Sequence, residues 1–385
     1  MRRMSDTGTT PPAAPADVRP STGGPSGGGA SSEDTVLVVG AGISGLAAAR
    51  ALAAAGVPVR VVDRGRAPGG RMGGRRLEGR PVDLGASYLT AEPGSAFDAV
   101  VQDWVGRGMA HPWTDTFAVA GPEGLRSTTS GPVRYGAAGG LRSLVADLAT
   151  GVAVEAGRTV RTVEPGGTAG GTAGGTAGGT AGGTAGGTAG GVAGGAAGAA
   201  RGGATGAAAD GEPYRAVVLA MPDAQARRLL PAGSSAAEAL DARPAWEPVV
   251  AVALGFDRRA WPADLHGAFV HDSDVLSFVA DDGDRRGDGA PVLVAHTTAE
   301  LAAAHLDDPQ GAVGPVVRAL TAMLGLPDPA WTHAHRWTFA RPAEPTDAPF
   351  LHADGVGLCG DGWAARPSVQ GAWISGDALG RAFAC

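Results

Sequence analysis

The sequence contains no lysine. All 31 residues counted as Lys or Arg among its 385 are arginines. Schiff-base chemistry and a lysine base both need an ε-amine, so both mechanisms are excluded for this chain. Cysteine is also scarce: only Cys359 and Cys385 occur, which excludes a disulfide framework and fits a reducing compartment. We therefore expect a cytoplasmic location.

Long apolar runs and clusters of basic side chains are absent as well. No segment approaches the roughly 20 consecutive apolar residues that cross a bilayer, so we expect no membrane partner. The net charge of -7 and the lack of a basic cluster argue against nucleic acid as a partner. The lack of a long apolar run predicts a soluble protein. The sequence does not indicate its oligomeric state.

The first 33 residues have hardly any large apolar side chains. They are rich in Pro, Gly, Ser and Thr, and they cannot bury enough surface to offset the entropy of ordering. We predict a disordered tail over 1–33. Arg2-Arg3 is not followed by an apolar segment, so an export signal is not supported, and Met4 is an alternative start.

A second segment of this kind lies in the middle of the chain. The motif Gly-Gly-Thr-Ala occurs six times from Gly166 to Ala189, and degenerate copies continue to about Gly211. A period of four with only small side chains is too short for a solenoid, whose repeats have about 20 residues or more. We predict a flexible insert over 166–211 that is dispensable for chemistry.

The most informative motif begins with the apolar run 36–39 and continues with three glycines, Gly40, Gly42 and Gly45. This spacing joins a strand to a helix in dinucleotide-binding turns. Gly40 permits the sharp turn, Gly42 lets a pyrophosphate approach the backbone, and Gly45 lets the helix lie close to the strand. The helix N-terminus then presents free N–H groups to the phosphates. At this point NAD and FAD are both admissible.

An acidic residue follows at the spacing that such a site requires. Asp63 ends a second apolar strand about 20 residues after the glycines, where a carboxylate accepts hydrogen bonds from ribose hydroxyls. Gly355, Gly357 and Gly360 repeat the glycine spacing, but no helical run follows them. The second copy is therefore not a dinucleotide turn.

A glycine-rich loop at 68–75 carries arginines, among them Arg71. Flexible backbone beside a guanidinium suits contact with a pyrophosphate or with the edge of a large cofactor. The alternative is an arginine loop that only contacts solvent. Residues 81–89 follow as a buried strand and turn.

Hydrophobic spacing predicts helices over 96–107, 141–148, 223–230 and 312–324 and a hairpin from 116–120 and 125–129. It also predicts two short strands within 152–163 and further strands over 214–221, 248–256, 275–280 and 291–296. Residues 331–339 alternate strictly between aromatic side chains, histidine included, and Thr, Ala or Arg, which predicts a strand. His333 and His335 lie on its aromatic face, but no third ligand is suggested nearby. We expect no metal site and interpret both imidazoles as packed.

These blocks, in this order, resemble the flavin-dependent amine oxidase superfamily. The dinucleotide turn is followed by Gly69-Gly70-Arg71 and then by Asp83-Leu84-Gly85-Ala86. The resemblance implies an α/β fold with a Rossmann-like FAD-binding domain and a mixed-sheet α+β substrate domain, the amine oxidase and p-hydroxybenzoate hydroxylase architecture. The expected FAD-binding domain comprises 34–92, 133–232 and 350–385, and the expected substrate domain comprises 93–132 and 233–349.

The resemblance also implies that the cofactor is FAD, bound noncovalently because neither cysteine falls at an attachment motif. In this superfamily an acid in the last turn binds the ribityl chain, which places Asp361 in that role. The following helix directs its N-terminus at the flavin N1/O2 edge, where negative charge accumulates on reduction. The expected FAD contacts are Gly40, Gly42, Ile43, Ser44, Gly45, Asp63, Arg64, Gly70, Arg71, Met72, Gly85, Ala86, Ser87, Gly360, Asp361, Gly371, Ala372 and Trp373.

The blocks 292–298 and 335–337, with the spacing from Gly360 to Gly371, are similar to renalase and its bacterial relatives. This similarity implies an oxidase that takes a hydride from 2- and 6-dihydro isomers of NAD(P)H at flavin N5 and passes the electrons to oxygen. For His296 a capped core histidine remains the alternative, and for Arg336 a structural ion pair. The expected pocket residues are Tyr88, His296, Thr297, Arg336, Trp337, Trp363 and Gln370.

Two other functions stay open. Amine oxidases of the superfamily commonly place a lysine near flavin N5 and paired aromatic rings around the amine. This chain has no lysine and three tyrosines, although tryptophans can replace the latter, so oxidation of a small amine or polyamine remains an alternative. A non-catalytic flavoprotein that serves as a redox sensor or scaffold is the alternative from another class.

Overall fold

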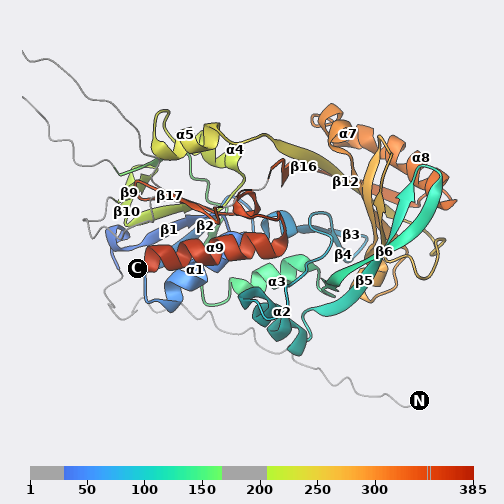
Figure 1. Cartoon of the computed structure of the whole chain (residues 1–385), viewed down its shortest axis with the longest axis horizontal. Coiled ribbons are helices and arrows are strands. Elements are labelled where there is room, and N and C mark those ends of the chain that lie inside the picture. Colours follow the sequence, from blue (N-terminus) through green and yellow to red (C-terminus); the bar gives the residue numbers. More distant parts are fainter. Residues whose placement is uncertain (1–29, 167–205, 345, 347) are drawn as a thin grey trace, which may run out of the picture. The chain divides into compact units, whose positions relative to one another are not determined.

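The computed structural model describes residues 30–166, 206–344, 346 and 348–385. The fold below is that of 31–385, the unit that holds every described residue except Ala30 (Figure 1). Residues 1–29 of the tail predicted over 1–33, and nearly all of the Gly-Gly-Thr-Ala repeats, lie outside the described residues.

A six-stranded sheet holds the dinucleotide-binding motif. Its strands are β1 (Val36–Val39), β2 (Val59–Asp63), β7 (Val154–Ala156), β11 (Ala216–Leu219), β17 (Leu351–Ala353) and β18 (Val356–Leu358), in the order β17-β18-β11-β1-β2-β7. All neighbours are parallel except the edge pair β17 and β18. Parallel strands are covered on both faces, which explains why every side chain of β1 is buried.

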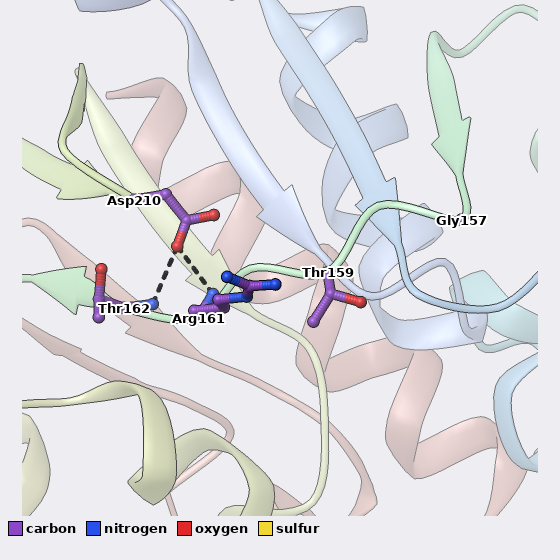
Figure 2. Close-up of a pocket in the computed structure, with 5 residues that line it drawn as sticks. All are labelled: Gly157, Thr159, Arg161, Thr162 and Asp210. Carbon is purple, nitrogen blue, oxygen red and sulfur yellow. Dashed lines mark hydrogen bonds between the residues drawn. The ribbon is translucent and has the colours of Figure 1, made fainter.

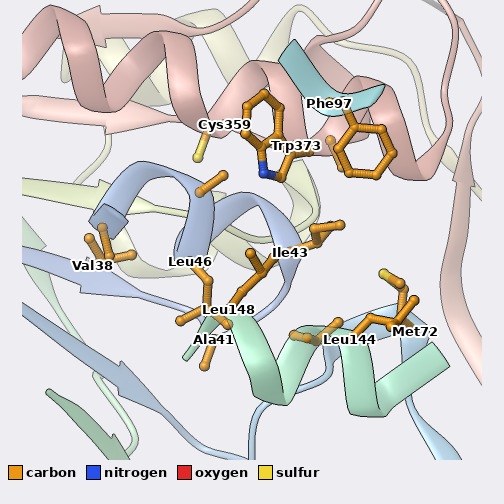
Figure 3. Close-up of a cluster of buried hydrophobic side chains, with 14 of the residues drawn as sticks. Val38, Ala41, Ile43, Leu46, Met72, Phe97, Leu144, Leu148, Cys359 and Trp373 are labelled. Atoms are coloured by element: carbon orange, nitrogen blue, oxygen red, sulfur yellow. The ribbon is translucent and has the colours of Figure 1, made fainter. Parts of the chain in front are cut away.

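Four helices pack against one face of this sheet: α1 (Ile43–Ala54), α2 (Ala96–Gly106), α3 (Leu141–Leu148) and α9 (Val369–Ala384). Their apolar side chains meet Val38 in one core, in which Leu46, Phe97 and Trp373 are buried (Figure 3). Each such side chain stabilises the fold by roughly 1.5–3 kcal/mol through loss of contact with water. Gly376 of α9 lies so close to α1 that a Cβ there would overlap the backbone of Ser44.

The opposite face is covered by a small antiparallel sheet and two short helices. The sheet contains β8 (Val163–Glu164), β9 (Ala207–Ala209) and β10 (Glu212–Tyr214), and the helices are α4 (Asp223–Ala226) and α5 (Ser235–Asp241). Leu37 and Val39 of β1 point into this second core beside Tyr214. The alternation of β1 between the two cores fixes its register.

The structure differs from the prediction at the ends of the two low-complexity segments. Residues 206–211 were expected to belong to the flexible insert, but β9 pairs with both β8 and β10 in this stretch. The predicted tail ends earlier than residue 33, because Ser32–Asp34 form a 3-10 turn whose N-cap side chain, Ser31, accepts a hydrogen bond from Asp34 N. Small side chains do not prevent strand pairing when the backbone donors and acceptors are satisfied.

A seven-stranded sheet follows the order β16-β12-β15-β14-β13-β5-β6. It contains β5 (His111–Gly121), β6 (Gly124–Gly136), β12 (Trp246–Gly255), β13 (Gly267–Val270), β14 (Leu276–Asp281), β15 (Val292–Thr297) and β16 (Trp331–Pro342). It is antiparallel except for the β13–β5 pair, so it is a mixed sheet as expected.

The two faces of this sheet have different neighbours. Val250 and Leu293 belong to a core with α8 (Val313–Leu324) and α7 (Ala299–Ala304). Ala251 and Val294, which alternate with them, pack against Leu84 near the β3–β4 hairpin (Gly74–Leu77 and Arg80–Asp83). The second face is thus directed at the part of the chain that carries the glycine-rich loops.

Most of the long predicted elements are confirmed, but their ends move. The hairpin extends to β5 and β6, and the helix expected over 223–230 is divided into α4 and a 3-10 turn, Arg227–Leu229. The short helix α6 (Asp282–Arg286), α7 and β13 have no counterpart in the prediction. The boundaries proposed for two domains remain a prediction.

Candidate functional site

The three glycines of the β1–α1 turn have different surroundings. Gly40 has a φ of 116°, and a Cβ there would lie 2.5 Å from Ala220 O. A Cβ at Gly45 would overlap the carbonyl of Gly40, so helix and turn touch at this point. Around Gly42 the nearest atom to a Cβ would be Gly70 Cα at 3.7 Å. Gly40 and Gly45 are therefore required by the fold, whereas Gly42 leaves space for a ligand.

Asp63 lies at the end of β2, beside this turn. Its carboxylate accepts hydrogen bonds from Ala41 N and Gly65 N, both at 2.6 Å. Each oxygen keeps a second lone pair, so a ribose hydroxyl can still bind. Asp63 thus also holds the turn in shape, a structural task that the sequence pattern did not reveal. Arg64, the next residue, is exposed.

The second glycine-rich loop lies next to the first. Gly69 N donates to Ala41 O at 3.0 Å, and a Cβ on Gly70 would lie 3.1 Å from Gly42 Cα. Met72 follows in the core beneath the loop, with 4% of its surface exposed. The two glycine-rich segments therefore form one backbone surface.

Arg71 connects this surface to the end of the chain. Its Nη1 donates to Asp361 Oδ2 at 2.7 Å and its Nη2 donates to Asp361 Oδ1. Nη1 also donates to Ala340 O at 3.1 Å, and the guanidinium lies 4.9 Å from the centre of the Trp246 ring. The two expected FAD contacts, Arg71 and Asp361, are thus brought together in a bidentate pair.

Residues 84–87 form the next part of the same surface. Ala86 N donates to Arg71 O at 2.9 Å, and a Cβ on Gly85 would overlap that carbonyl. Trp337 of β16 donates its Nε1–H to Leu84 O at 2.7 Å, which ties the seven-stranded sheet to this loop. The hydroxyl of Ser87 is buried and has no hydrogen-bond partner among the described residues.

Helix α9 begins close to Asp361 and was expected to direct free N–H groups at a flavin. Ser368 caps it, because its Oγ accepts from Gly371 N and its carbonyl accepts from Ala372 N, both at 3.0 Å. In the first turn of α9, the backbone N–H groups of Val369 and Gln370 have no hydrogen-bond partner among the described residues. Donors for a ligand are therefore one or two positions earlier than the expected Gly371, Ala372 and Trp373, because the cap satisfies Gly371 and Ala372, and Trp373 is buried in the core.

The face of the seven-stranded sheet that looks toward Leu84 carries a row of aligned side chains. His335 of β16 is paired with Ala251 of β12, Ala251 with His296 of β15, and His296 with Phe278 of β14. The rings of Phe278 and His296 are 6.0 Å apart, and the Tyr88 ring is 6.2 Å from Phe278. Two expected pocket residues, Tyr88 and His296, are thus brought to one aromatic wall.

Both histidines of this row are neutral at physiological pH. Burial lowers the pKa of His296 to about 4, and nearby Arg285 acts in the same direction. Burial also lowers the pKa of His335 to about 4, with Arg75 contributing. The Nε2 of His296 is buried without a partner among the described residues, so it is available to a ligand.

Two other expected pocket residues lie on the opposite face. The Thr297 hydroxyl accepts a hydrogen bond from Val250 N at 3.1 Å, and the side chain is fully buried in a structural position. Arg336 is exposed and donates to Leu306 O at the helical side of the sheet. Successive residues of a strand face opposite sides, so Thr297 points away from the face of His296 and Arg336 away from the face of His335. The structure thus corrects the placement of Thr297 and Arg336 in the pocket.

Trp363 and Gln370 flank the Asp361 turn, but their side chains are engaged elsewhere. Trp363 lies in the core on the other side of the six-stranded sheet, with the Arg243 guanidinium 4.2 Å from its ring centre. The amide oxygen of Gln370 accepts a hydrogen bond from Glu92 N at 2.8 Å. Gln370 therefore contributes its backbone N–H rather than its side chain.

A buried charge network lies beneath the site, and no sequence pattern predicted it. Asp282 pairs with Arg285, with Arg286 at 3.2 Å and with Arg80 at 2.8 Å. Asp83 pairs with Arg286 at 3.0 Å and accepts a hydrogen bond from Leu141 N at 3.1 Å. The segment 281–288 has the sequence of a solvent-exposed turn. Only its burial in the structure shows that it belongs to a charge network.

The carboxylates of this network have different electrostatic environments. Burial raises the pKa of Asp83, with Arg285 and Arg286 opposing the effect. Burial would also raise the pKa of Asp282, but Arg285, Arg286 and Arg80 together outweigh it and lower that pKa. Arg285 donates its Nη1–H to Ser87 O at 2.6 Å, so the network supports the loop that carries Tyr88.

Comparison with known proteins is consistent with this geometry. Residues 38–104 match the model of the NAD(P)-binding Rossmann-like domain, and residues 122–378 match the model of the flavin containing amine oxidoreductases. The chain belongs to the flavin-containing amine oxidoreductase family. The matching model is that of flavin-containing oxidoreductases, and the α/β fold expected for the chain is confirmed.

Individual relatives of this flavin amine oxidoreductase match over short segments or in fold alone. Hydroxyneurosporene desaturase of Rhodobacter capsulatus is 51% identical over 59 residues, which are 15% of this chain, and the match covers only 12% of that relative's length. A putrescine oxidase structure has a TM-score of 0.64 at 15% identity, covering 92% of this chain and 99% of that one. Cyclohexylamine oxidase from Brevibacterium oxydans gives 0.59 at 15% identity, covering 91% and 99%.

FAD fits the residues that the structure brings together in this family member. Gly42 leaves open backbone, Val369 and Gln370 have unpaired N–H groups, and Ser87 has an orphaned buried hydroxyl. An anionic cofactor bound at the N-terminus of α1 would meet its dipole. The described residues contain no group of three or more His, Cys, Asp or Glu side chains arranged for a metal, and none of their helices is long and apolar enough to cross a membrane.

A separate surface pocket of about 650 Å³ is lined by Gly157, Thr159, Arg161, Thr162 and Asp210 (Figure 2). Asp210 Oδ1 accepts hydrogen bonds from the backbone of Arg161 at 2.8 Å and of Thr162 at 3.0 Å. Gly157 N donates to Gly65 O at 2.8 Å, and the next residue, Arg158, donates its N–H to Asp63 O at 3.0 Å, so the pocket adjoins the end of β2. None of the aromatic wall residues lines it, so we do not place the reaction there.

Proposed function

We propose that this protein is an FAD-dependent oxidase that removes a hydride from a small-molecule donor, and that the donors are 2- and 6-dihydro isomers of NAD(P)H. The observation that carries the proposal is the neutral aromatic wall formed by Tyr88, Phe278 and His296. The wall offers a face for stacking and no charged base.

The chemistry of the donor distinguishes two substrate classes. A dihydronicotinamide becomes an aromatic cation when it loses a hydride, and it has no proton to lose first. An alkylammonium ion must be deprotonated before its carbon can release a hydride. His296 and His335, with pKa values of about 4, are weak bases for that task, and the chain has no lysine. The wall therefore favours the dihydronicotinamide.

The residues that would hold FAD are those already brought together. Gly42 and the start of α1 would bind the pyrophosphate, Asp63 a ribose, and Asp361 with Arg71 the ribityl side. The N–H groups of Val369 and Gln370, at the positive end of α9, would stabilise negative charge on the reduced ring. FAD bound there would supply a hydride acceptor at N5 and a route for the two electrons to oxygen, which with the flavin proton and one proton from solvent becomes hydrogen peroxide.

The remaining residues bind and orient the donor. Tyr88 and Phe278 provide apolar surface, and His296 presents an uncharged Nε2 that can hydrogen-bond a carboxamide. Orienting the donor carbon over the ring supplies the rate enhancement, because no covalent intermediate with the protein is needed. We further propose that the cofactor is noncovalent: Cys359 is fully buried, and burial raises its thiol pKa to about 12, which keeps it unreactive.

An anaerobic reduction experiment tests this function. The purified holoprotein is mixed with borohydride-isomerised NAD(P)H, and separately with primary amines, secondary amines and polyamines, while flavin absorbance is followed. We expect bleaching by the isomers, with a rate nearly constant from pH 6 to 8 because the wall does not titrate there. Bleaching by amines alone would establish amine oxidation instead, and the absence of bleaching by any donor would favour a non-catalytic flavoprotein.

A variant pair locates the donor at the wall. His296→Phe keeps an aromatic ring at this position and removes the imidazole nitrogens. We expect the flavin to be reduced at least tenfold more slowly, with unchanged FAD content. His271→Gln is the control, because His271 is exposed in the loop between β13 and β14. Equal rates for H296F and wild type would remove His296 from the proposed site.

A further inference from the structure

One arginine next to the aromatic wall is buried without a partner. Arg134 of β6 is 5% exposed, and its Nε and Nη1 are buried with no hydrogen-bond partner among the described residues. The other deeply buried arginines, Arg285 and Arg286, both pair with Asp282. A buried guanidinium that lacks a carboxylate is costly for the fold, so its presence requires another reason.

The surroundings of Arg134 are aromatic rather than acidic. Its Cζ lies 3.9 Å from the centre of the Phe117 ring and 5.5 Å from that of Tyr88. Cation–π contact compensates only part of the lost hydration, and it leaves the N–H groups without acceptors. Arg134 therefore has buried N–H donors and a positive charge that an anionic oxygen could pair with.

Arg134 lies next to the aromatic wall proposed to bind the substrate. The adjacent residue, Tyr135, exchanges backbone hydrogen bonds with Leu89, so the end of β6 lies along the loop that carries Ser87 and Tyr88. The centre of the Tyr88 ring lies 6.2 Å from that of Phe278 and 5.4 Å from that of Phe117. The wall thus runs from His296 to Arg134 through Phe278 and Tyr88, with a neutral imidazole at one end and a cation at the other.

We propose that Arg134 is a specificity residue that binds an anionic oxygen group, a phosphate or a carboxylate, on the substrate. The proposal rests on the proposed function in that the aromatic wall is taken as the substrate site. A planar guanidinium binds two oxygens of such a group at once, which fixes the orientation of the donor along the wall. A substrate without an anionic group leaves the buried cation unpaired and binds more weakly.

Matched substrate pairs test the proposal on the holoenzyme. Isomerised dihydronicotinamide mononucleotide is compared with its neutral riboside, and an amino acid with the amine formed by its decarboxylation. In wild type we expect half-saturation of flavin reduction at a concentration at least tenfold lower for the anionic member of whichever pair reduces the flavin. Arg134→Gln raises that concentration at least tenfold and changes it less than twofold for the neutral member. An equal effect on both members, or no effect on either, overturns the proposal.

Two variants control for structure. Arg126→Gln changes an arginine on the same strand whose side chain is 42% exposed and paired with Asp272, and it is expected to behave as wild type. Arg134→Met keeps the contact with Phe117 and removes the unpaired charge, so the protein should melt at the same temperature as wild type or higher. A lower melting temperature for R134M would assign Arg134 to the structure alone, as a cation–π contact.

A binding measurement separates this proposal from the proposed function. Wild-type holoenzyme is titrated calorimetrically with inorganic pyrophosphate and with benzoate, which represent the phosphate and the carboxylate. Binding that R134Q abolishes supports the anion site even if no dihydronicotinamide reduces the flavin, in which case only the proposed function fails. If wild type binds neither anion and shows no preference within either substrate pair, the anion site is rejected while the proposed function can still stand.

Discussion

The guanidinium of Arg71 binds both carboxylate oxygens of Asp361, with Nη1 and Oδ2 2.7 Å apart, although the two residues are 290 positions apart in the chain. Arg71 belongs to the second glycine-rich loop and Asp361 to the turn before α9. The pair therefore closes the ring of segments expected to surround FAD. Its side chains are 28% and 12% exposed, so the interaction is only partly screened by water.

Breaking this pair should weaken cofactor binding. For Arg71→Met we expect the dissociation constant for FAD to rise about tenfold or more, since a charge-assisted bidentate contact contributes about 1.5–3 kcal/mol. The constant is measured by flavin fluorescence with the apoprotein. Arg76→Met is the control, because Arg76 is exposed on β3. Identical constants for R71M and R76M would show that the pair does not position the cofactor.

Substitutions at two glycines should separate folding from FAD binding. A Cβ at Gly45 overlaps the carbonyl of Gly40, so Gly45→Ala is expected to lower the melting temperature of the apoprotein and to reduce its soluble yield. A Cβ at Gly42 meets only Gly70 Cα, at 3.7 Å, so Gly42→Ala should fold normally but bind FAD more weakly. Thermal melting and FAD titration of both variants check this. A G42A protein that binds FAD as wild type does would contradict the pyrophosphate assignment.

The stability of the fold should decrease in mild acid because of His296. Its pKa of about 4 is below the ordinary 6.5, so the unfolded chain takes up a proton before the folded chain does. The stability that comes from keeping the His296 imidazole neutral is fully present above pH 6.5. It is lost as the pH falls from 6.5 toward 4, because protonation of the unfolded chain then favours unfolding. Denaturant unfolding at pH 7.5 and 4.5 measures it. For His296→Phe we expect the decrease to be about 2 kcal/mol smaller than for wild type. The exposed control His271→Gln should retain the full decrease, and an H296F decrease equal to that of wild type would refute the prediction.

The buried charge network should be sensitive to the loss of one carboxylate. Asp282→Asn removes one of the two carboxylates that Arg285 and Arg286 share and leaves them only Asp83, and breaking a buried pair from one side costs about 3–5 kcal/mol. Asp288→Asn is the matched control, because Asp288 also pairs with Arg80 but its side chain is 42% exposed. We expect a loss of less than about 1 kcal/mol there. Denaturant titration compares the two, and similar losses would show that burial does not matter.

The two cysteines should differ in reactivity. Burial raises the pKa of Cys359 to about 12, whereas Cys385 is exposed at the end of the chain. At pH 8 we expect iodoacetamide to modify Cys385 in the native protein and to reach Cys359 only after unfolding. Peptide mass spectrometry before and after addition of denaturant measures this. Rapid labelling of native Cys359 would show that the core around Phe97 and Trp373 opens readily.

The local patterns in the sequence predicted the parts of the site that depend on backbone. The strand, turn and helix around Gly40 follow from the run 36–39 and the glycine spacing, and the structure has them where expected. The face of β16 that carries His333 and His335 follows from strict alternation. Such features need only neighbours in the chain, because steric limits on φ and ψ and the period of a strand determine them.

Contacts between side chains that are distant in the sequence were harder to predict. Thr297 and His296 are adjacent, and alternation requires that they face opposite sides, but only the pairing of β15 with β12 shows which side meets Leu84. The acid-rich segment 281–288 has the composition of a solvated turn. Its burial depends on carboxylate–guanidinium pairs with Asp83 and Arg80, which come from distant positions.

The sequence by itself predicted a dinucleotide-binding turn at Gly40, Gly42 and Gly45 and excluded lysine chemistry, since both follow from residue type and short-range spacing. Only the tertiary structure decided that Arg71 meets Asp361, that α9 offers Val369 and Gln370 rather than Gly371, and that Arg134 is buried beside Tyr88 without an acid. Those outcomes depend on desolvation and on contacts between distant segments, and neither is encoded in any one stretch of the chain.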